Sequence, residues 1–180
     1  MSWALVVAAR GGKRSLAARE VADALTARGL RIGGFTQRTL ERENGDKSFE
    51  LVRAAGGAVL PLARADKRAA PEGGGCSVVF DPGAFEAARR WVEDDVRASD
   101  VVVLDGVGKL ELAGEGHRAA IGRALASAPL VVLAVRDDQL VYAVEALELD
   151  EPVATYTDGD GAEARDAFVA AVASAARAGR

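Results

Sequence analysis

Short apolar runs separated by amphipathic segments set the pattern of this chain. Six consecutive apolar residues from Trp3 to Ala8, followed closely by two glycines, are typical of a strand that is buried on both faces. The run from Val101 to Asp105 gives the strongest strand signal. Between such runs, apolar residues recur at helical spacing. Further strands are expected at 30–37, 48–53, 58–62, 76–80, 130–135 and 153–157, and helices at 15–28, 82–98, 117–127, 139–147 and 161–178.

Strands that alternate with helices of ten or more residues predict a mainly parallel sheet with right-handed crossovers. The central part of the chain departs from this plan. Residues 38–47 are polar and contain Asn44-Gly45, a hairpin signal, and two strand candidates follow them. The stretch 63–75 combines basic residues, a proline and three consecutive glycines, so we expect it to be more mobile than the sheet. We therefore expect an α/β fold in a single domain, 1–180, with a β-hairpin and loop insertion at about 38–75.

Composition narrows the class of protein. A chain of 180 residues is long enough to bury an ordinary core. Its single cysteine excludes an internal disulfide, and one cysteine with one histidine cannot form a zinc site. The formal net charge of -4 argues against a nucleic-acid scaffold. The N-terminal apolar run is too short for a signal peptide or a membrane span, so we expect a cytoplasmic enzyme or binding protein with neither a nucleic-acid nor a membrane partner.

The segment between the first strand and the first helix, 8–15, is similar to a phosphate-binding loop. Such a loop needs glycines that expose backbone N–H groups, a lysine for the β- and γ-phosphates, and a Ser/Thr hydroxyl for Mg²⁺. Gly12-Lys13 stands in the right place, but Val7 replaces the first glycine of the pattern and Arg14 replaces the Ser/Thr. A phosphate site and a plain strand–helix turn therefore both remain open. In the first case the contacts to the ligand come from Arg10, Gly11, Gly12, Lys13, Arg14 and Ser15.

Two further strands end in charged residues, at the edge of the sheet where ligands of α/β proteins usually bind. Asp105 either holds Mg²⁺, as the corresponding aspartate of phosphate-loop proteins does, or simply caps the next turn. It is followed by Gly106, where a catalytic carboxylate is often found in such proteins. Arg136 either meets a phosphate or pairs with one of the two aspartates that follow it. We expect Asp105 on a strand adjacent to the first, facing the same crevice as Lys13.

The stretch 100–112, D-V-V-V-L-D-G-V-G-K-L-E-L, resembles the D-x-V-V-I-D-E-I-G-K-M-E-L signature of the thermophile-type nucleoside-triphosphatase family, called cancer-related NTPases in vertebrates. The similarity covers most of residues 3–147. It implies a phosphate-loop (P-loop) NTPase-like three-layer sandwich and a nucleotide, ATP or GTP, as the ligand. Three upstream segments resemble further motifs of the family: Gly34-Phe-Thr-Gln, Arg42-Glu-Asn-Gly and Phe49-Glu-Leu-Val.

The departures from the family pattern bear on catalysis. Gly106 stands where the family has a glutamate, which removes the presumed general base, and Arg14 removes the hydroxyl that would bind Mg²⁺. Arg10 and Arg14 can supply positive charge in place of a metal, because a guanidinium binds phosphate bidentately. Glu111 is either a distant base or a structural carboxylate paired with its neighbouring lysine. His117 is expected to be a solvated surface residue.

We therefore expect a nucleoside-triphosphate-binding protein with weak or lost hydrolysis. Its candidate catalytic residues are Asp105, Glu111 and Arg136; Asp105 is also the candidate metal ligand, with a weak or absent Mg²⁺ requirement. Gly74-Gly-Cys-Ser and Asp81-Pro-Gly-Ala also resemble a related, uncharacterised bacterial family associated with molybdenum metabolism. The alternative is thus a non-hydrolysing accessory protein of that metabolism, which binds a nucleotide or a small oxyanion such as molybdate. A purely structural protein is the third possibility, and the sequence names no protein partner.

Overall fold

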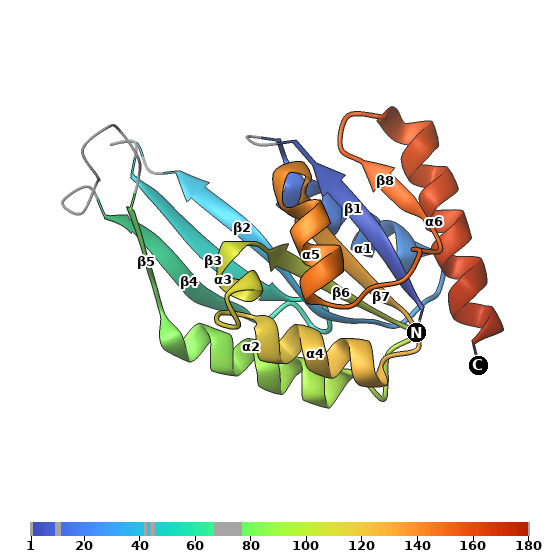
Figure 1. The fold of residues 1–180 in the computed structure, drawn as a ribbon, viewed down its shortest axis with the longest axis horizontal. Helices are drawn as coiled ribbons and strands as arrows, with labels where there is room; N and C mark the ends of the chain where they lie inside the picture. Colours follow the sequence, from blue (N-terminus) through green and yellow to red (C-terminus); the bar gives the residue numbers. More distant parts are fainter. Residues whose placement is uncertain (1, 10–11, 42, 44–45, 67–76, 180) are drawn as a thin grey trace.

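The computed structural model describes residues 2–9, 12–41, 43, 46–66 and 77–179. In this part of the chain eight strands form one sheet in the order β5-β4-β3-β2-β6-β7-β1-β8 (Figure 1). The strands are β1 (Trp3–Ala8), β2 (Ile32–Glu41), β3 (Lys47–Arg53), β4 (Val59–Asp66), β5 (Ser77–Phe80), β6 (Val101–Val107), β7 (Val131–Arg136) and β8 (Thr155–Thr157). The helices are α1 (Arg14–Ala27), α2 (Pro82–Asp95), α3 (Lys109–Leu112), α4 (Arg118–Ser127), α5 (Leu140–Ala146) and α6 (Gly161–Ala178), with a short 3₁₀ turn, η1 (Asp137–Gln139).

The sheet has a parallel part and an antiparallel part that meet in β2. The first residues of β2, from Ile32 to Phe35, pair in parallel with β6, and the rest of the parallel part follows through β7, β1 and β8. From Phe35 to Glu41 the same strand pairs in antiparallel fashion with β3, and β4 and β5 continue this meander. The expected α/β fold with a hairpin insertion is therefore confirmed. The insertion extends the main sheet; that the whole chain is one domain stays a prediction.

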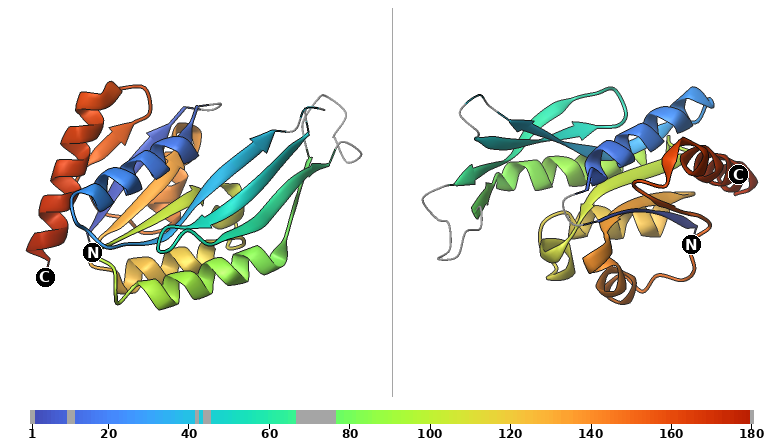
Figure 2. Two further views of the ribbon diagram at one scale, coloured as in Figure 1. Left: turned by 180° about the vertical axis from the view of Figure 1, so that it is seen from behind. Right: turned by 90° about the horizontal axis from the view of Figure 1, so that it is seen from above.

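Helices cover both faces of the sheet, because successive side chains of a strand point to opposite faces. In β1, Trp3, Leu5 and Val7 pack in one core with α2, α4 and α5, whereas Ala4 and Val6 pack in a second core with α1 and α6. Figure 2 shows α1 and α2 on opposite sides of the sheet. The result is a three-layer sandwich. Among the described helices none has the length and apolar character needed to cross a bilayer.

Several boundaries differ from those expected. Residues 63–66 belong to β4 and are not part of a loop, and residues 67–75 of the expected mobile stretch lie outside the described residues. The expected strand 76–80 begins at Ser77, and α3 was not expected.

The expected neighbour of β1 is wrong. β7 lies between β1 and β6, with Ala8 of β1 opposite Arg136 and Asp105 of β6 opposite Ala134. Since all three strands are parallel, their carboxyl ends still meet at one edge.

Candidate active site

Gly12, which follows β1, lies where a side chain would come too close to the backbone of Ala9. The backbone N–H of Gly12 donates to the carbonyl of Ala9 at 2.8 Å, and a Cβ on Gly12 would lie 2.9 Å from that same oxygen. The next N–H, that of Lys13, donates to Oδ2 of Asp158 at 2.8 Å. Asp158 follows β8, so the C-terminal part of the chain reaches the loop. The structure gives no description of Arg10 and Gly11, so their predicted contacts lie outside the described residues.

Asp105 is buried and both of its carboxylate oxygens are occupied by protein groups. Nε of Arg14, the first residue of α1, donates to Oδ1 at 2.8 Å, and the backbone N–H of Gln37 donates to Oδ2 at 2.9 Å. The side-chain amide of Gln37 also donates to the backbone carbonyl of Asp105 at 3.2 Å. The Asp105 side chain is 0% exposed and that of Arg14 is 19% exposed, so water screens this ion pair poorly.

The residue after Asp105 is held in a conformation that favours glycine. Gly106 has a φ of +119° and lies at an irregularity in the pairing of β6 with β7. A Cβ built on it would lie 2.2 Å from Nε2 of Gln37. The amide of Gln37 therefore fills the space into which a side chain at position 106 would extend. A glutamate there requires the flexible side chain of Gln37 to move aside and a backbone conformation that residues with a Cβ rarely adopt.

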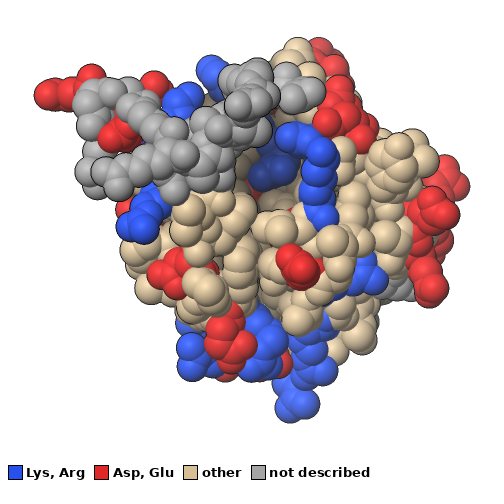
Figure 3. All heavy atoms as spheres, turned by 60° about the vertical axis from the view of Figure 1, so that its left-hand side comes forward, with Lys and Arg blue, Asp and Glu red and all other residues tan. Residues whose placement is uncertain are grey.

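A cavity of about 510 Å³ lies between the start of α1 and the β2–β3 hairpin, and we call it the basic cavity. Its lining contains no carboxylate among the described residues. Figure 3 shows such a hollow, with Lys and Arg side chains in and around it. Besides Gly12, Ser15 and Phe49, the lining includes five cationic side chains: Lys13, Arg14, Arg19, Arg38 and Arg136.

The position of Arg136 is compatible with both of its predicted roles, pairing with a following aspartate and contact with a phosphate. Its Nε and Nη2 donate to the two carboxylate oxygens of Asp138 at 3.0 and 2.9 Å, so the predicted pairing with a following aspartate is confirmed. The same side chain also lines the basic cavity. Its contact with a phosphate stays a prediction.

Glu111 lies away from the basic cavity, in α3, and its oxygens are engaged by the backbone. Oε2 accepts the N–H of Gly108 and Oε1 accepts the N–H of His117, each at 3.0 Å. Burial raises the pKa of this carboxyl, which is 4% exposed. These two contacts make Glu111 a cap for α3 and for the start of α4; Lys109 has no part in them.

The prediction that His117 is a surface residue is wrong. The residue is 2% exposed, and its ring lies between those of Phe35 and Phe85, with centroid distances of 4.5 and 4.8 Å. Burial, helped by the positive charge of Arg14, lowers the pKa of the imidazole from 6.5 to about 4. The ring is therefore neutral at pH 7. It lines a second cavity with Glu111, on the other side of Arg14 and Gln37.

The structure brings together most of the predicted site residues. Gly12, Lys13, Arg14 and Ser15 line the basic cavity with Arg136. Asp105 joins them through Arg14, and Glu111 stands apart. Sequence reasoning missed Gln37, Arg38 and Asp158 as site residues, although Gln37 ends one of the motifs quoted above.

Comparison with known proteins agrees with the family resemblance of the sequence and with the observed fold. A family model described as "NTPase" matches residues 5–166. The chain belongs to this NTPase family. The solution structure of a human cancer-related nucleoside triphosphatase is similar, with a TM-score of 0.64 and 20% identity over 100% of each chain. At that identity the likeness shows the fold alone, which is P-loop NTPase-like as expected. No curated protein matches the chain.

The expected resemblance to the NTPase family is thus confirmed, while the resemblance to the molybdenum-associated family stays a prediction. The Mg²⁺ ion that the NTPase family implies does not fit the residues present. Both oxygens of Asp105 accept protein hydrogen bonds, and a guanidinium stands in place of the hydroxyl that would bind the ion. Within the described residues, no group of three or more His, Cys, Asp or Glu side chains is placed to hold a metal.

Proposed function

We propose that this NTPase-family protein binds the phosphates of a nucleoside triphosphate, ATP or GTP, in the basic cavity, and hydrolyses it slowly or not at all. The observation that carries the proposal is the ion pair between Arg14 and Asp105. It uses a loop residue and a strand-end carboxylate, which is the pair of positions that hold Mg²⁺ in active phosphate-loop enzymes. Here that pair neutralises itself, so binding needs no resident metal.

Charge supports the binding half of the proposal. A triphosphate is a multiple anion, and five cationic side chains line the cavity. Three of them also pair with carboxylates outside the lining, Arg14 with Asp105, Arg38 with Glu50 and Arg136 with Asp138, so the positive charge is largest at Lys13 and Arg19. The N-terminus of α1, a helix of 14 residues, adds the favourable field of its unpaired N–H groups. Arginine suits this task because its planar guanidinium binds phosphate oxygens bidentately.

The proposal of slow or absent hydrolysis depends on whether a carboxylate at the strand ends can activate a water molecule. Hydrolysis needs an oriented nucleophile, and a general base contributes typically 10²–10⁴-fold. Gly106 offers no carboxylate, Asp105 is locked by Arg14 and Gln37, and both oxygens of Glu111 accept backbone N–H groups. The arginines can still stabilise phosphate charge. The residues present therefore support phosphate binding but do not supply a general base for hydrolysis.

One observation favours a second function. A cavity with several cations and no carboxylate in its described lining suits a tetrahedral oxyanion, which needs no metal for its recognition. The alternative is accordingly a non-hydrolysing protein that binds an oxyanion such as molybdate and assists molybdenum metabolism.

Thermal unfolding with ATP, GTP or molybdate, each with Mg²⁺ or with EDTA, tests both functions. A ligand at 100 times its dissociation constant should add about 2.7 kcal/mol to the stability of the folded state. We expect ATP or GTP to stabilise the protein equally with and without Mg²⁺, Lys13→Ala to abolish the effect, and Arg123→Ala, an exposed residue of α4, to leave it intact. Stabilisation by molybdate alone supports the alternative. Binding that requires Mg²⁺, or turnover of about 1 s⁻¹ or faster, contradicts the proposal.

A second experiment asks whether the missing base limits hydrolysis. Because the amide of Gln37 lies in the space beside Gly106, we would restore the glutamate of the family together with a smaller residue at position 37: Arg14→Thr, Gln37→Ala, Gly106→Glu. We expect hydrolysis by the triple variant to exceed that of the parent by about 10²-fold, the lower range for a general base. The double variant that keeps Gly106 is the control. If the double variant is as fast as the triple, the base is not what the parent lacks.

A further inference from the structure

A second cavity, of about 560 Å³, lies beside the basic cavity and differs from it in character. We call it the aromatic cavity. Phe80, Phe85 and His117 line it on the apolar side, and Lys109 brings a cation that the basic cavity does not use. Arg14 and Arg136 line both cavities. The two cavities therefore meet at these arginines.

His117 is the feature of the aromatic cavity that the fold does not explain. Neither ring nitrogen has a hydrogen-bond partner among the described residues, although both atoms are buried. An unpaired buried polar group destabilises the fold, and such groups are rare in native proteins, so this one calls for an explanation. Both Phe35 and Phe85 pack against the ring. The neutral imidazole offers one donor and one acceptor.

The aromatic rings form a surface suited to a planar ligand. Phe80 and Phe85 lie with their centroids 5.5 Å apart, and Phe85 contacts the ring of His117 edge to face. Phe80 is 39% exposed, so part of its ring is accessible to a ligand in the cavity. Aromatic rings with a few polar groups are the usual lining of a pocket for a small molecule, and a cavity of this volume is of the usual size.

The charges of the aromatic cavity suit a small anion. Three cations, Arg14, Lys109 and Arg136, line it together with two carboxylates, Glu111 and Asp138. The basic cavity has five cations and no carboxylate in its described lining; Arg14 and Arg136, which both cavities share, are each paired with an aspartate, so Lys13 and Arg19 distinguish the basic cavity and Lys109 the aromatic one. A polyphosphate is therefore favoured in the basic cavity, whereas a single phosphate group suits the aromatic cavity.

We propose that the aromatic cavity binds a nucleoside monophosphate, with its base against Phe80, Phe85 and His117 and its phosphate toward Lys109 and Arg136. Both nitrogens are buried in the structure, so the ring must shift slightly on binding, and the base then supplies the donors and acceptors that the imidazole of His117 lacks. This site does not depend on triphosphate binding, because His117, Lys109 and both phenylalanines line the aromatic cavity and do not line the basic cavity.

The chain has a single histidine, so the nitrogen signals of one imidazole report directly on this cavity. We would titrate the full chain with AMP, GMP, CMP and UMP and follow these signals by ¹H–¹⁵N NMR, with affinity from calorimetry. We expect at least one monophosphate to shift both ring nitrogens, while inorganic tripolyphosphate leaves them in place. Lys109→Ala should weaken the binding of that monophosphate at least tenfold, and Arg123→Ala should leave it within twofold.

Two further variants separate this site from the basic cavity. His117→Phe keeps a ring in the core and removes its nitrogens, so we expect weaker monophosphate binding and an unchanged or higher unfolding temperature. Lys13→Ala should leave monophosphate binding within twofold. If monophosphate binding is lost in Lys13→Ala and kept in Lys109→Ala, the ligand lies in the basic cavity and the proposal is overturned. Absence of binding at millimolar concentration, or binding that leaves the histidine signals unmoved, overturns it as well.

Discussion

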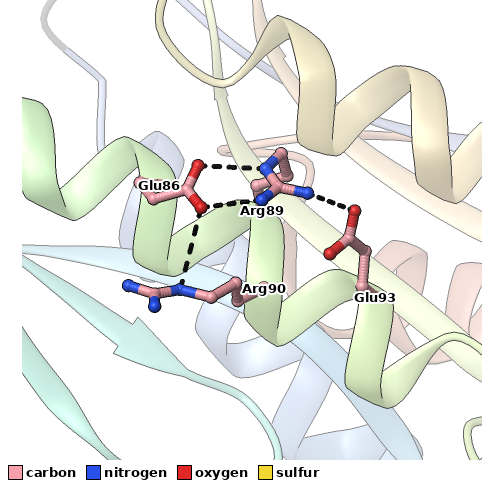
Figure 4. Close-up of polar contacts among 4 residues, drawn as sticks. All are labelled: Glu86, Arg89, Arg90 and Glu93. Atoms are coloured by element: carbon pink, nitrogen blue, oxygen red, sulfur yellow. Dashed lines mark hydrogen bonds and ion pairs between the residues drawn. The ribbon is translucent and has the colours of Figure 1, made fainter.

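Two arginines of this protein form ion pairs of almost the same length in opposite surroundings. Arg14 meets Asp105 at 2.8 Å, at the edge of the sheet where the site lies. Arg89 meets Glu86 at 2.7 Å on the outer side of α2, where it also contacts Glu93, and Arg90 adds a longer contact to Glu86 (Figure 4). The side chains of Arg89 and Glu86 are 36% and 51% exposed, whereas that of Asp105 is fully buried.

The difference teaches that burial decides the energy of an ion pair and that its length does not. Exposed pairs are screened by water and salt and add little to stability, whereas removal of one partner from a buried pair leaves a charge without compensation. The surface network on α2 is therefore an ordinary solvated helix face. The pair at the site contributes to the stability of the fold, because the buried Asp105 carboxylate has Arg14 as its countercharge.

The largest expected effect comes from breaking the buried pair. In Arg14→Ala, Oδ1 of Asp105 loses its partner inside the protein, so we expect the free energy of unfolding to fall by about 3–5 kcal/mol. Urea denaturation of the parent and the variant at pH 7 measures this loss. A loss no larger than that of Arg89→Ala would show that water replaces the guanidinium without cost.

A second buried group, His117, extends the comparison to pH. The unfolded chain protonates His117 near pH 6.5, but the folded chain does so only near pH 4, because burial disfavours the imidazolium. The stability linked to His117 is thus intact above pH 6.5 and is lost as the pH falls toward 4, by up to about 3 kcal/mol. Denaturation of the parent and of His117→Phe between pH 7 and pH 4 isolates this part. Parallel curves for the two proteins would contradict it.

A smaller effect concerns the metal. If Arg14 keeps Mg²⁺ away from Asp105, Arg14→Thr should let Mg²⁺ strengthen nucleotide binding by about tenfold, or about 1.4 kcal/mol, and the parent should show no such change. Calorimetric titration with ATP or GTP in Mg²⁺ and in EDTA gives both numbers. Arg89→Thr is the matched control. Equal Mg²⁺ dependence in the parent and in Arg14→Thr would remove the arginine as the cause.

The smallest effect is expected on α2. Arg89 lowers the pKa of Glu86 through a hydrogen bond and its charge, so this network favours the folded chain above the ordinary pKa of glutamate and stops doing so as the pH falls. Both side chains are exposed, and salt screens them. We expect Arg89→Ala to unfold at the same urea concentration as the parent in 1 M NaCl. A clearly lower urea midpoint for Arg89→Ala at that salt concentration would show that this surface pair contributes to stability as the buried pair does.

The sequence predicts the parts of this molecule that local patterns determine. The run 3–8 gives the first strand, its continuation gives the loop and α1, and the alternation of elements gives the α/β class. Contacts between distant segments are different. Lys13 and Asp158 are 145 residues apart, and Gln37 and Asp105 are 68 apart, so no local spacing indicates that they meet.

Two errors have the same cause. His117 follows a glycine-rich turn and is predicted to be exposed, but Phe35 of β2 and Phe85 of α2 cover it from elements far away in the chain. The position of β7 between β1 and β6 likewise depends on how crossovers are arranged in space, which periodicity does not encode. The sequence therefore predicts the loop residues of the candidate site, but it does not predict the residues that distant segments of the chain bring to that loop.

Asp158 occupies a backbone donor of the phosphate-type loop. Its carboxylate already takes the Lys13 N–H, so an anion that uses this group must replace an anion that the chain itself supplies. The observed dissociation constant is then the intrinsic one divided by the fraction of molecules in which Asp158 has withdrawn. Asp158 stands in the turn between β8 and α6, beside Gly159 with a φ of +106°. The affinity of the cavity for its ligand is thus set partly by the freedom of a turn near the other end of the chain.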